Sequence, residues 1–162
     1  MCVTGGEPLL QPDLEDFLRK VKEMGYAVKL DTNGMLPQRL AGVLATNLVD
    51  YVAMDIKSSP SGYPAATGTD ADVSAVSDSL SILRAADIPF ELRTTAVRGI
   101  HTAADFAAIG EWIGDVPAYF IQRFVDSGQL LGSGFPAFSD EEMEHLLTTV
   151  REYVPSAQLR GM

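Results

Sequence analysis

The chain alternates short β-type runs with amphipathic helical segments along most of its length. Residues 51–56 are almost continuously apolar, which is typical of a strand that is covered on both faces. Residues 12–24 instead carry apolar side chains at helical spacing, with Pro12 suited to a first turn and Gly25 to a C-terminal cap. Such alternation produces βαβ units with parallel strands and right-handed crossovers. The sequence therefore predicts an α/β fold built on a parallel sheet.

The patterns predict about six strands and about five helices. Thr102 with Asp105, and Ser139 with Glu142, have the spacing of capping pairs ahead of the last two helices. One short strand is expected to end just before Gly5. The other expected strands cover residues 27–31, 51–56, 90–97, 118–125 and 157–160. Expected helices cover residues 12–24, 38–45 and 72–86, begin after Thr102, and run from Ser139 to about residue 153. Expected connections cover residues 57–68 and 126–138.

Length and composition set limits on the class of protein. The 162 residues fit one domain, 1–162, and 46% hydrophobic with 21% charged residues is ordinary globular usage. Twelve basic against 22 acidic residues give a net charge of −10, which disfavours nucleic acid and anionic membrane as partners. Neither a membrane span nor a signal-type segment is apparent, so the expected localisation is cytoplasmic.

Cys2 is the single cysteine of the chain. One cysteine forms neither an intrachain disulfide nor a cysteine cluster for zinc or iron–sulfur. We expect Cys2 to be a small buried hydrophobic residue at the start of a strand rather than a metal ligand.

A sharp corner follows the first predicted strand, at Val3-Thr4-Gly5-Gly6-Glu7-Pro8. The two glycines let the backbone bend and approach a ligand closely. Pro8 biases Glu7 toward an extended conformation, so its carboxylate is held on a stiff corner at a strand end. Such a carboxylate suits a ligand ammonium group. The alternative is a tight strand-to-helix turn with a solvated glutamate.

Polar side chains follow three successive predicted strands at the point where each strand ends. Because the carboxyl ends of parallel strands share one rim, we expect these side chains to converge. In an unbroken strand Asp55 and Lys57 point the same way. Acids beside a lysine would hold both the ammonium and the carboxylate of an amino-acid ligand, and a structural ion pair is the alternative. The expected set is Glu7, Asp31, Thr32, Asn33, Asp55 and Lys57.

The other candidates are weaker. Arg93 is either a further anion contact or a surface arginine. His101 and His145 are expected to be solvated, and no serine or cysteine nucleophile forms a hydrolytic triad with either histidine. The aromatic residues expected in the core are Phe120, Phe124 and Phe135.

Three motifs carry a family resemblance: Val3-Thr4-Gly5-Gly6-Glu7-Pro8, Leu30-Asp31-Thr32-Asn33-Gly34 and Met54-Asp55-Ile56-Lys57. In this order and spacing the chain resembles radical S-adenosylmethionine (SAM) enzymes of the glycyl-radical activating type. It is similar to the pyruvate formate-lyase activating enzymes, and more so to the anaerobic ribonucleoside-triphosphate reductase activating proteins. The second likeness also extends over residues 51–59, 92–102 and 153–161.

The resemblance implies a fold and a set of ligand contacts. The fold is a partial (βα)6-type parallel barrel that lacks its first βα unit. Residues matching Asp31, Thr32 and Asp55 hold a monovalent cation near SAM in the formate-lyase activators. Gln122, which matches more loosely, falls inside its predicted strand rather than at the rim. The implied SAM contacts are Gly5, Gly6, Glu7, Pro8, Thr32, Asn33, Asp55, Lys57, Arg93 and Gln122.

The chain departs from the family pattern at the iron–sulfur cluster. Such families place three cysteines in a Cys-x3-Cys-x2-Cys loop that ligates a [4Fe–4S] cluster, and Cys2 matches none of them. No side chain supplies the electron that cleaves SAM, so the cluster belongs to the full-length parent only. We expect the chain to be a truncated radical SAM core domain that does not perform the reaction alone.

The implied function is that of the SAM-binding part of an activase. The parent would form a 5′-deoxyadenosyl radical and install a glycyl radical on an anaerobic ribonucleotide reductase, with flavodoxin or ferredoxin as electron donor. The alternatives within the superfamily are enzymes like the pyruvate formate-lyase activators or the 7-carboxy-7-deazaguanine synthases. Two alternatives lie outside the superfamily: a non-catalytic SAM-binding module, and an aldolase with Lys57 as Schiff-base nucleophile. Neighbouring Asp31 and Asp55 argue against the aldolase, because carboxylates keep a lysine protonated.

Overall fold

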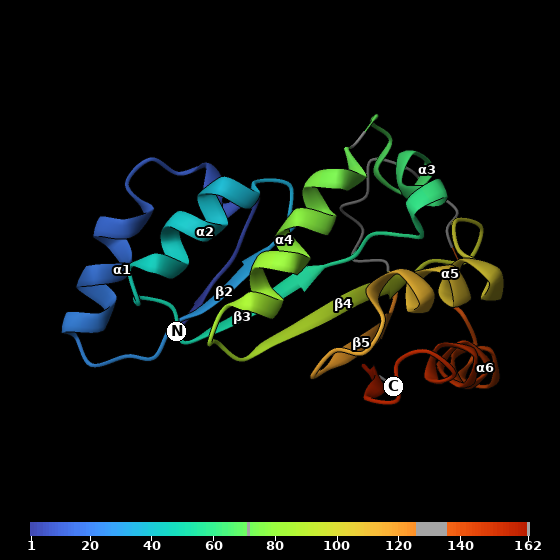
Figure 1. Cartoon of the computed structure of the whole chain (residues 1–162). Helices are drawn as coiled ribbons and strands as arrows, with labels where there is room; N and C mark the ends of the chain where they lie inside the picture. The colour runs from blue at the N-terminus through green and yellow to red at the C-terminus, as the bar shows by residue number, and fades with distance from the viewer. Residues whose placement is uncertain (71, 126–135, 162) are drawn as a thin grey trace. The chain divides into compact units, whose positions relative to one another are not determined.

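The computed structural model describes residues 1–70, 72–125 and 136–161 (Figure 1). The chain divides into two compact units, which are described separately. The first unit comprises Met1–Ile56 and Asp72–Glu91, and the second comprises Lys57–Ala71 and Leu92–Met162. The organisation as one domain over residues 1–162 stays a prediction.

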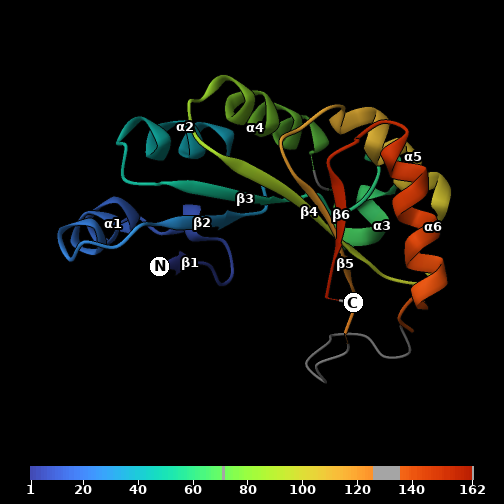
Figure 2. The same cartoon turned by 90° about the horizontal axis from the view of Figure 1, so that it is seen from below.

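The first unit contains a parallel sheet of β1, β2 and β3 with helices along one face (Figures 1 and 2). In the register of this sheet, Val3 pairs with Leu30 and Leu30 with Val52. The helices bury an apolar stripe on that face, because residues three and four apart share one side of a helix. The elements are β1 (Cys2–Val3), η1 (Pro8–Leu10, a 3-10 turn), α1 (Leu14–Glu23), β2 (Lys29–Thr32), α2 (Pro37–Ala45), β3 (Tyr51–Asp55) and α4 (Val73–Ala85).

The two faces of this sheet differ in chemistry. Leu30, Val52 and Met54 are fully buried on the face toward the helices. The opposite face carries charges: Lys29 Nζ lies 3.5 Å from Asp31 Oδ1 and 3.4 Å from Glu91 Oε1. The hydroxyl of Tyr51 also donates to Glu91, at 3.2 Å. The first unit therefore has an apolar core on one side of its sheet and a polar face on the other.

The second unit repeats the pattern with β4, β5 and β6, again parallel. Helices α5 and α6 contact each other and lie side by side in both views (Figures 1 and 2). Leu92, Ile121 and Ala157 are fully buried. The elements are η2 (Pro60–Gly62), α3 (Tyr63–Thr67), β4 (Phe90–Ala96, which enters this unit at Leu92), α5 (Ala103–Ile113), β5 (Tyr119–Arg123), α6 (Asp140–Arg151) and β6 (Ala157–Arg160).

Most predicted elements are confirmed. The strands are parallel and alternate with helices, as expected of an α/β fold. Both capping boxes are present, with Thr102 paired to Asp105 and Ser139 to Glu142. His145 is exposed, as predicted. The prediction for residues 126–138 falls mostly on 126–135, outside the described residues, as does Phe135.

Other predictions are wrong. Residues 57–68 are not a plain connection, because they contain η2 and α3. Phe17 and Met24 follow the helical spacing of α1 but are 44% and 61% exposed. Only part of the apolar face of α1 is buried against the rest of the unit. Cys2 is at the start of a strand, as predicted, but it is exposed rather than buried. No helix in the described parts of the chain has the length and apolar character needed to span a membrane.

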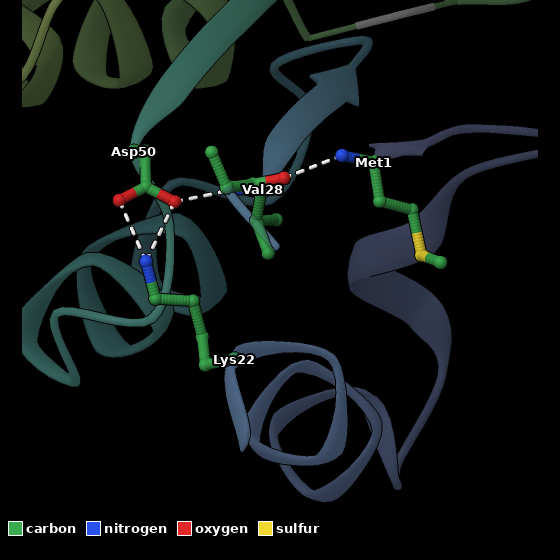
Figure 3. Close-up of polar contacts among 5 residues, drawn as sticks. Met1, Lys22, Val28 and Asp50 are labelled. Atoms are coloured by element: carbon green, nitrogen blue, oxygen red, sulfur yellow. Dashed lines mark hydrogen bonds and ion pairs between the residues drawn. The ribbon is translucent and has the colours of Figure 1, made fainter. Parts of the chain in front are cut away.

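The carboxylate of Asp50 fastens the start of β3 to two neighbours in the first unit (Figure 3). Lys22 Nζ donates to its two oxygens at 2.7 and 2.8 Å, and the backbone N–H of Val28 donates at 2.6 Å. The N-terminal ammonium of Met1 donates to the carbonyl oxygen of Ala27 beside this cluster. The hydrogen bonds from Lys22 and Val28 lower the pKa of Asp50 from its ordinary value. Asp50 thereby links the end of α1 with the chain ahead of β2.

We expect Asp50→Asn to lower the free energy of unfolding by about 1 kcal/mol at pH 7, since the group is half-exposed and solvent screens it. The folded state favours the ionised carboxylate, so its contribution is complete above the ordinary pKa and disappears as the pH falls through the lowered one. Urea denaturation at pH 7 and at pH 3 measures both effects. The difference between wild type and variant should narrow at the lower pH.

Asp87→Asn, which changes an exposed carboxylate in the turn before β4, is the matched control. An equal loss of stability in both variants, or a difference from wild type that does not depend on pH, would contradict a role of the Asp50 contacts.

Candidate functional site

The carboxylate of Glu7 joins the end of β1 to the end of β2. Its Oε1 accepts the backbone N–H of Leu9 at 3.1 Å and the hydroxyl of Thr32 at 3.0 Å. Its Oε2 accepts the backbone N–H of Asn33 at 2.7 Å. Glu7 is only 8% exposed, so three donors from the chain stabilise a buried charge. Glu7 is thus neither solvated nor loosely held: the structure places it at a corner built from two of the three sequence motifs.

The glycines before Glu7 adopt conformations that other residues rarely take. The φ angles of Gly5 and Gly6 are +96° and +54°. Apart from the glycine itself and its two chain neighbours, no heavy atom of the described residues lies within 4 Å of the position that a Cβ would occupy at either glycine. The requirement for glycine here therefore comes from the backbone, which bends sharply and leaves its surface open to approach.

The turn after β2 is held by its own side chains. The hydroxyl of Thr32 accepts the N–H of Gly34 at 3.2 Å, and Asn33 Oδ1 accepts the N–H of Met35 at 2.9 Å. Gly34 has a φ of +74°, and a Cβ there would lie 2.7 Å from the sulfur of Met54. The residues that the sequence predicts beside the ligand, Thr32 and Asn33, thus form a rigid turn whose geometry needs glycine at its third position.

Two aspartates of the first unit, Asp31 and Asp55, lie on the polar face of its sheet. Asp31 pairs in register with Ala53, and Asp55 follows two residues later on the same side of β3. The side chain of Thr32 points to the other face, where it is bound to Glu7. The hydroxyl of Thr32 therefore does not lie on the face that carries Asp31 and Asp55. The cation site itself stays a prediction.

Lys57 lies in the second unit, just beyond β3, which ends at Asp55. The alternation of an unbroken strand, used to predict that Asp55 and Lys57 point the same way, stops before Lys57. The side chain of Lys57 is exposed, but the residues around it are not: Ile56 is fully buried, and Ser58 and Ser59 are 1% exposed. An exposed lysine therefore sits on a buried backbone.

Two side chains bind the backbone of Lys57. Its N–H donates to the hydroxyl oxygen of Tyr63 at 3.1 Å, and its carbonyl oxygen lies 2.9 Å from His101 Nε2. The other ring nitrogen, His101 Nδ1, accepts the N–H of Val97 at 3.1 Å. His101 is 5% exposed, so the expectation of a solvated histidine is wrong. The ring is buried because it satisfies backbone groups on two segments.

Asp105 ties the segment after Lys57 to the start of α5. Its Oδ1 accepts the hydroxyl of Ser59 at 2.9 Å, and its Oδ2 accepts the N–H and hydroxyl of Thr102 at 2.9 and 2.7 Å. Burial alone would raise the pKa of Asp105, but the hydrogen bonds from Thr102 and Ser59 outweigh burial and lower it. The helix cap that the sequence predicts therefore also anchors the chain beside Lys57.

The other predicted contacts, Arg93 and Gln122, lie on one face of the second unit's sheet. Arg93 pairs in register with Phe120, and Gln122 pairs with Arg160. The guanidinium of Arg160 lies over the ring of Phe120, 3.5 Å from its centroid. Phe120 is half-buried on this polar face, so the prediction that it belongs to the core is wrong. Phe124 is buried, as predicted.

Sequence reasoning missed Tyr63, His101 and Asp105 as neighbours of the Lys57 backbone. Tyr63 stands among serine, proline and glycine residues, a composition that suggests a loop. Asp105 was found as a cap, but its second bond, to Ser59, has no local signal. A histidine in a turn ahead of a helix also gives no sign that its ring binds a backbone carbonyl elsewhere in the chain.

No group of three or more His, Cys, Asp or Glu side chains that could hold a metal ion occurs in residues 1–70, 72–125 and 136–161. The whole sequence has one cysteine, whereas the family's cluster loop has three. The residues of this chain therefore do not fit a [4Fe–4S] cluster.

The polar corner of Glu7 fits a different group. Oε1 already accepts two hydrogen bonds, whereas Oε2 accepts one from Asn33, and each carboxylate oxygen has about two acceptor sites. One further donor, such as an ammonium, can therefore approach Oε2. The residues beside the open Gly5-Gly6 backbone fit the amino-acid end of SAM.

Comparison with known proteins gives three informative likenesses. A protein of Methanocaldococcus jannaschii named glycyl-radical enzyme activating enzyme MJ1227 is 27% identical over 99% of this chain and 70% of its own length. A 7-carboxy-7-deazaguanine synthase of Methanopyrus kandleri is 41% identical, but over 35% of this chain and 23% of its own length.

Among solved structures, a domain of a pyruvate-formate lyase-activating enzyme from Bacteroides vulgatus matches with a TM-score of 0.78 and 18% identity. The match covers 99% of this chain and 98% of that domain. It confirms the predicted α/β fold, an open parallel sheet of the partial-barrel type.

The model of one family, the radical SAM superfamily, matches residues 1–113, which include the Glu7 corner, the turn after β2 and the segment that holds Lys57. The chain belongs to the radical SAM superfamily.

Proposed function

We propose that this chain is the SAM-binding part of an activase that installs a glycyl radical on an anaerobic ribonucleotide reductase. The observation that carries the proposal is the Glu7 corner, in which a buried carboxylate, two glycines and a rigid turn meet at the ends of β1 and β2. The likeness to the M. jannaschii protein, which extends over 99% of this chain, supports an activase over other radical SAM reactions.

Each proposed contact has a physical basis. The methionine ammonium of SAM donates to Glu7 Oε2, and the Gly5-Gly6 backbone approaches the ligand closely because no side chain intervenes. Lys57 binds the methionine carboxylate through its exposed ammonium. Arg93 and Gln122 contact the ribose and adenine, and Pro8 keeps the corner stiff.

A SAM molecule bound to a [4Fe–4S] cluster would supply the 5′-deoxyadenosyl radical. The residues of this chain bind and orient the amino acid and the nucleoside of SAM; they transfer no proton. The proposed protein partners are the glycyl-radical enzyme and an electron donor, flavodoxin or ferredoxin.

SAM binding is the first test. At 17.4 kDa the chain suits ¹H–¹⁵N NMR, which detects weak binding in millimolar titrations. We expect SAM to shift the amide signals of Gly5, Gly6, Asn33 and Lys57. Lys57→Met should weaken binding roughly tenfold, which corresponds to one charge-assisted hydrogen bond. Lys20→Met, which removes an exposed lysine of α1, is the control and should bind SAM as wild type does. No shifts in the wild type at saturating SAM would overturn the proposal.

Glu7→Gln tests the two roles of the corner. The glutamine carbonyl can keep the bonds to Leu9 and Thr32, but its NH2 group then faces the N–H of Asn33, donor against donor. We expect the free energy of unfolding to fall by about 1–3 kcal/mol, and SAM binding to be lost in the folded fraction. Urea denaturation and the same NMR titration measure the two effects. Wild-type SAM affinity in this variant would exclude an ammonium contact at Oε2.

The choice of partner has its own test. We expect the immobilised chain to bind an anaerobic ribonucleotide reductase in biolayer interferometry, and to bind pyruvate formate-lyase at least tenfold more weakly. The reverse preference would favour the formate-lyase alternative. Binding to neither enzyme would contradict a glycyl-radical partner and favour the deazaguanine synthase alternative, which the local 41% identity supports.

A further inference from the structure

The backbone of Lys57 has more support than an exposed surface lysine needs. Tyr63 and His101 bind its N–H and its carbonyl oxygen, so both polar groups of one residue are held by side chains. Beyond the end of a strand, a residue's backbone N–H and C=O groups no longer bind a neighbouring strand. In an exposed segment, water molecules take the place of that strand. Here two side chains take its place, on a segment whose neighbours Ile56 and Ser58 are buried.

The two supporting side chains are themselves fixed. Tyr63 is 1% exposed and packs edge-to-face against Trp112, with ring centroids 5.9 Å apart and an interplanar angle of 87°. The ring of His101 lies 5.7 Å from that of Phe106. Both aromatic partners belong to α5. The two side chains that bind the Lys57 backbone therefore pack against the same helix of the second unit.

The hydrogen bonds also determine the state of the His101 ring. The N–H of Val97 can only donate, so His101 Nδ1 is the acceptor and carries no proton. The ring proton of the neutral histidine is then on Nε2, which donates to the carbonyl oxygen of Lys57. The carbonyl oxygen of Lys57 thus receives a directed donor, and its N–H donates to the hydroxyl of Tyr63.

We propose that Tyr63 and His101 are positioning residues that fix the Lys57 backbone so that its ammonium is aimed at the carboxylate of SAM. The proposal rests on the proposed function, in which Lys57 binds that carboxylate. A lysine side chain loses much rotamer freedom on binding, and a fixed Cα limits the volume that its ammonium must search. Neither residue touches SAM; each acts through Lys57.

A purely structural role is the competing explanation, since buried backbone groups need partners in any protein. Tyr119 offers a matched control. It is fully buried in the same unit and donates its hydroxyl to Thr94 at 2.7 Å. Tyr63→Phe and Tyr119→Phe therefore delete the same atom from a buried tyrosine, but only the first deletion reaches Lys57.

The experiment is the NMR titration with SAM on the whole chain. We expect Tyr63→Phe to raise the dissociation constant about three- to tenfold, the range for one lost hydrogen bond, while Tyr119→Phe leaves it unchanged. In the Lys57→Met background the effect of Tyr63→Phe should vanish, because the group that it positions is gone.

His101 provides an independent pair of variants. The side-chain amide nitrogen of glutamine can occupy the place of Nε2 and donate to Lys57, whereas asparagine reaches only the place of Nδ1. We expect His101→Asn to weaken SAM binding as Tyr63→Phe does, and His101→Gln to rescue it. Amide signal dispersion in each spectrum shows that the variant is folded.

The outcomes separate the two proposals. If wild type binds SAM and Tyr63→Phe binds it equally well, the positioning role is overturned and the proposed function stands. Equal weakening by Tyr63→Phe and Tyr119→Phe, or an effect that persists in Lys57→Met, also overturns it, because the cause is then general loosening. If wild type shows no binding, the proposed function fails and the positioning role fails with it.

Discussion

The carboxylate of Glu7 is the contact on which the candidate site depends. It is buried and ionisable, and two backbone N–H groups and one hydroxyl donate hydrogen bonds to it. A buried charge of this kind is stable only where several donors point at it, so the chain near residue 7 and the turn near residue 33 must be in place together. Of these three bonds, two go to Oε1 and one goes to Oε2. The carboxylate therefore joins the corner after β1 to the turn after β2.

Much of the fold follows from local sequence pattern. The strand at Tyr51–Asp55 and the helix at Pro37–Ala45 were predicted almost to the residue, because an apolar run and a helical stripe are signals that a short window contains. The short helix Tyr63–Thr67 was missed, because five residues among prolines and glycines are too few to show a period. Exposed Cys2 was misjudged for another reason: the burial of a side chain on a two-residue strand depends on neighbours that the strand's own sequence does not describe.

The candidate site likewise contains contacts that the sequence predicts and contacts that it does not. The rule that parallel strands end at one rim predicted that Glu7 would meet Thr32 and Asn33, and the structure confirms it. The contacts of His101 and Tyr63 with the Lys57 peptide had no sequence signal, because a backbone group looks the same at every residue and any donor in reach can bind it. Motifs therefore predict which side chains gather at the strand ends, while the side chains that bind the backbone beside them become apparent only in three dimensions.

The division of the chain into units has a consequence for its synthesis. The first unit takes in Asp72–Glu91 after the chain has already contributed Lys57–Ala71 to the second, so neither unit is one continuous stretch. Glu91, whose carboxylate binds Lys29 and Tyr51, is the last residue of the first unit to leave the ribosome. While Lys57–Ala71 of the second unit is translated, the polar face of β1, β2 and β3 still lacks Glu91. The first unit is thus complete once Glu91 has been translated, whereas Lys57–Ala71 can join its own unit only after Leu92 and the residues that follow it are made.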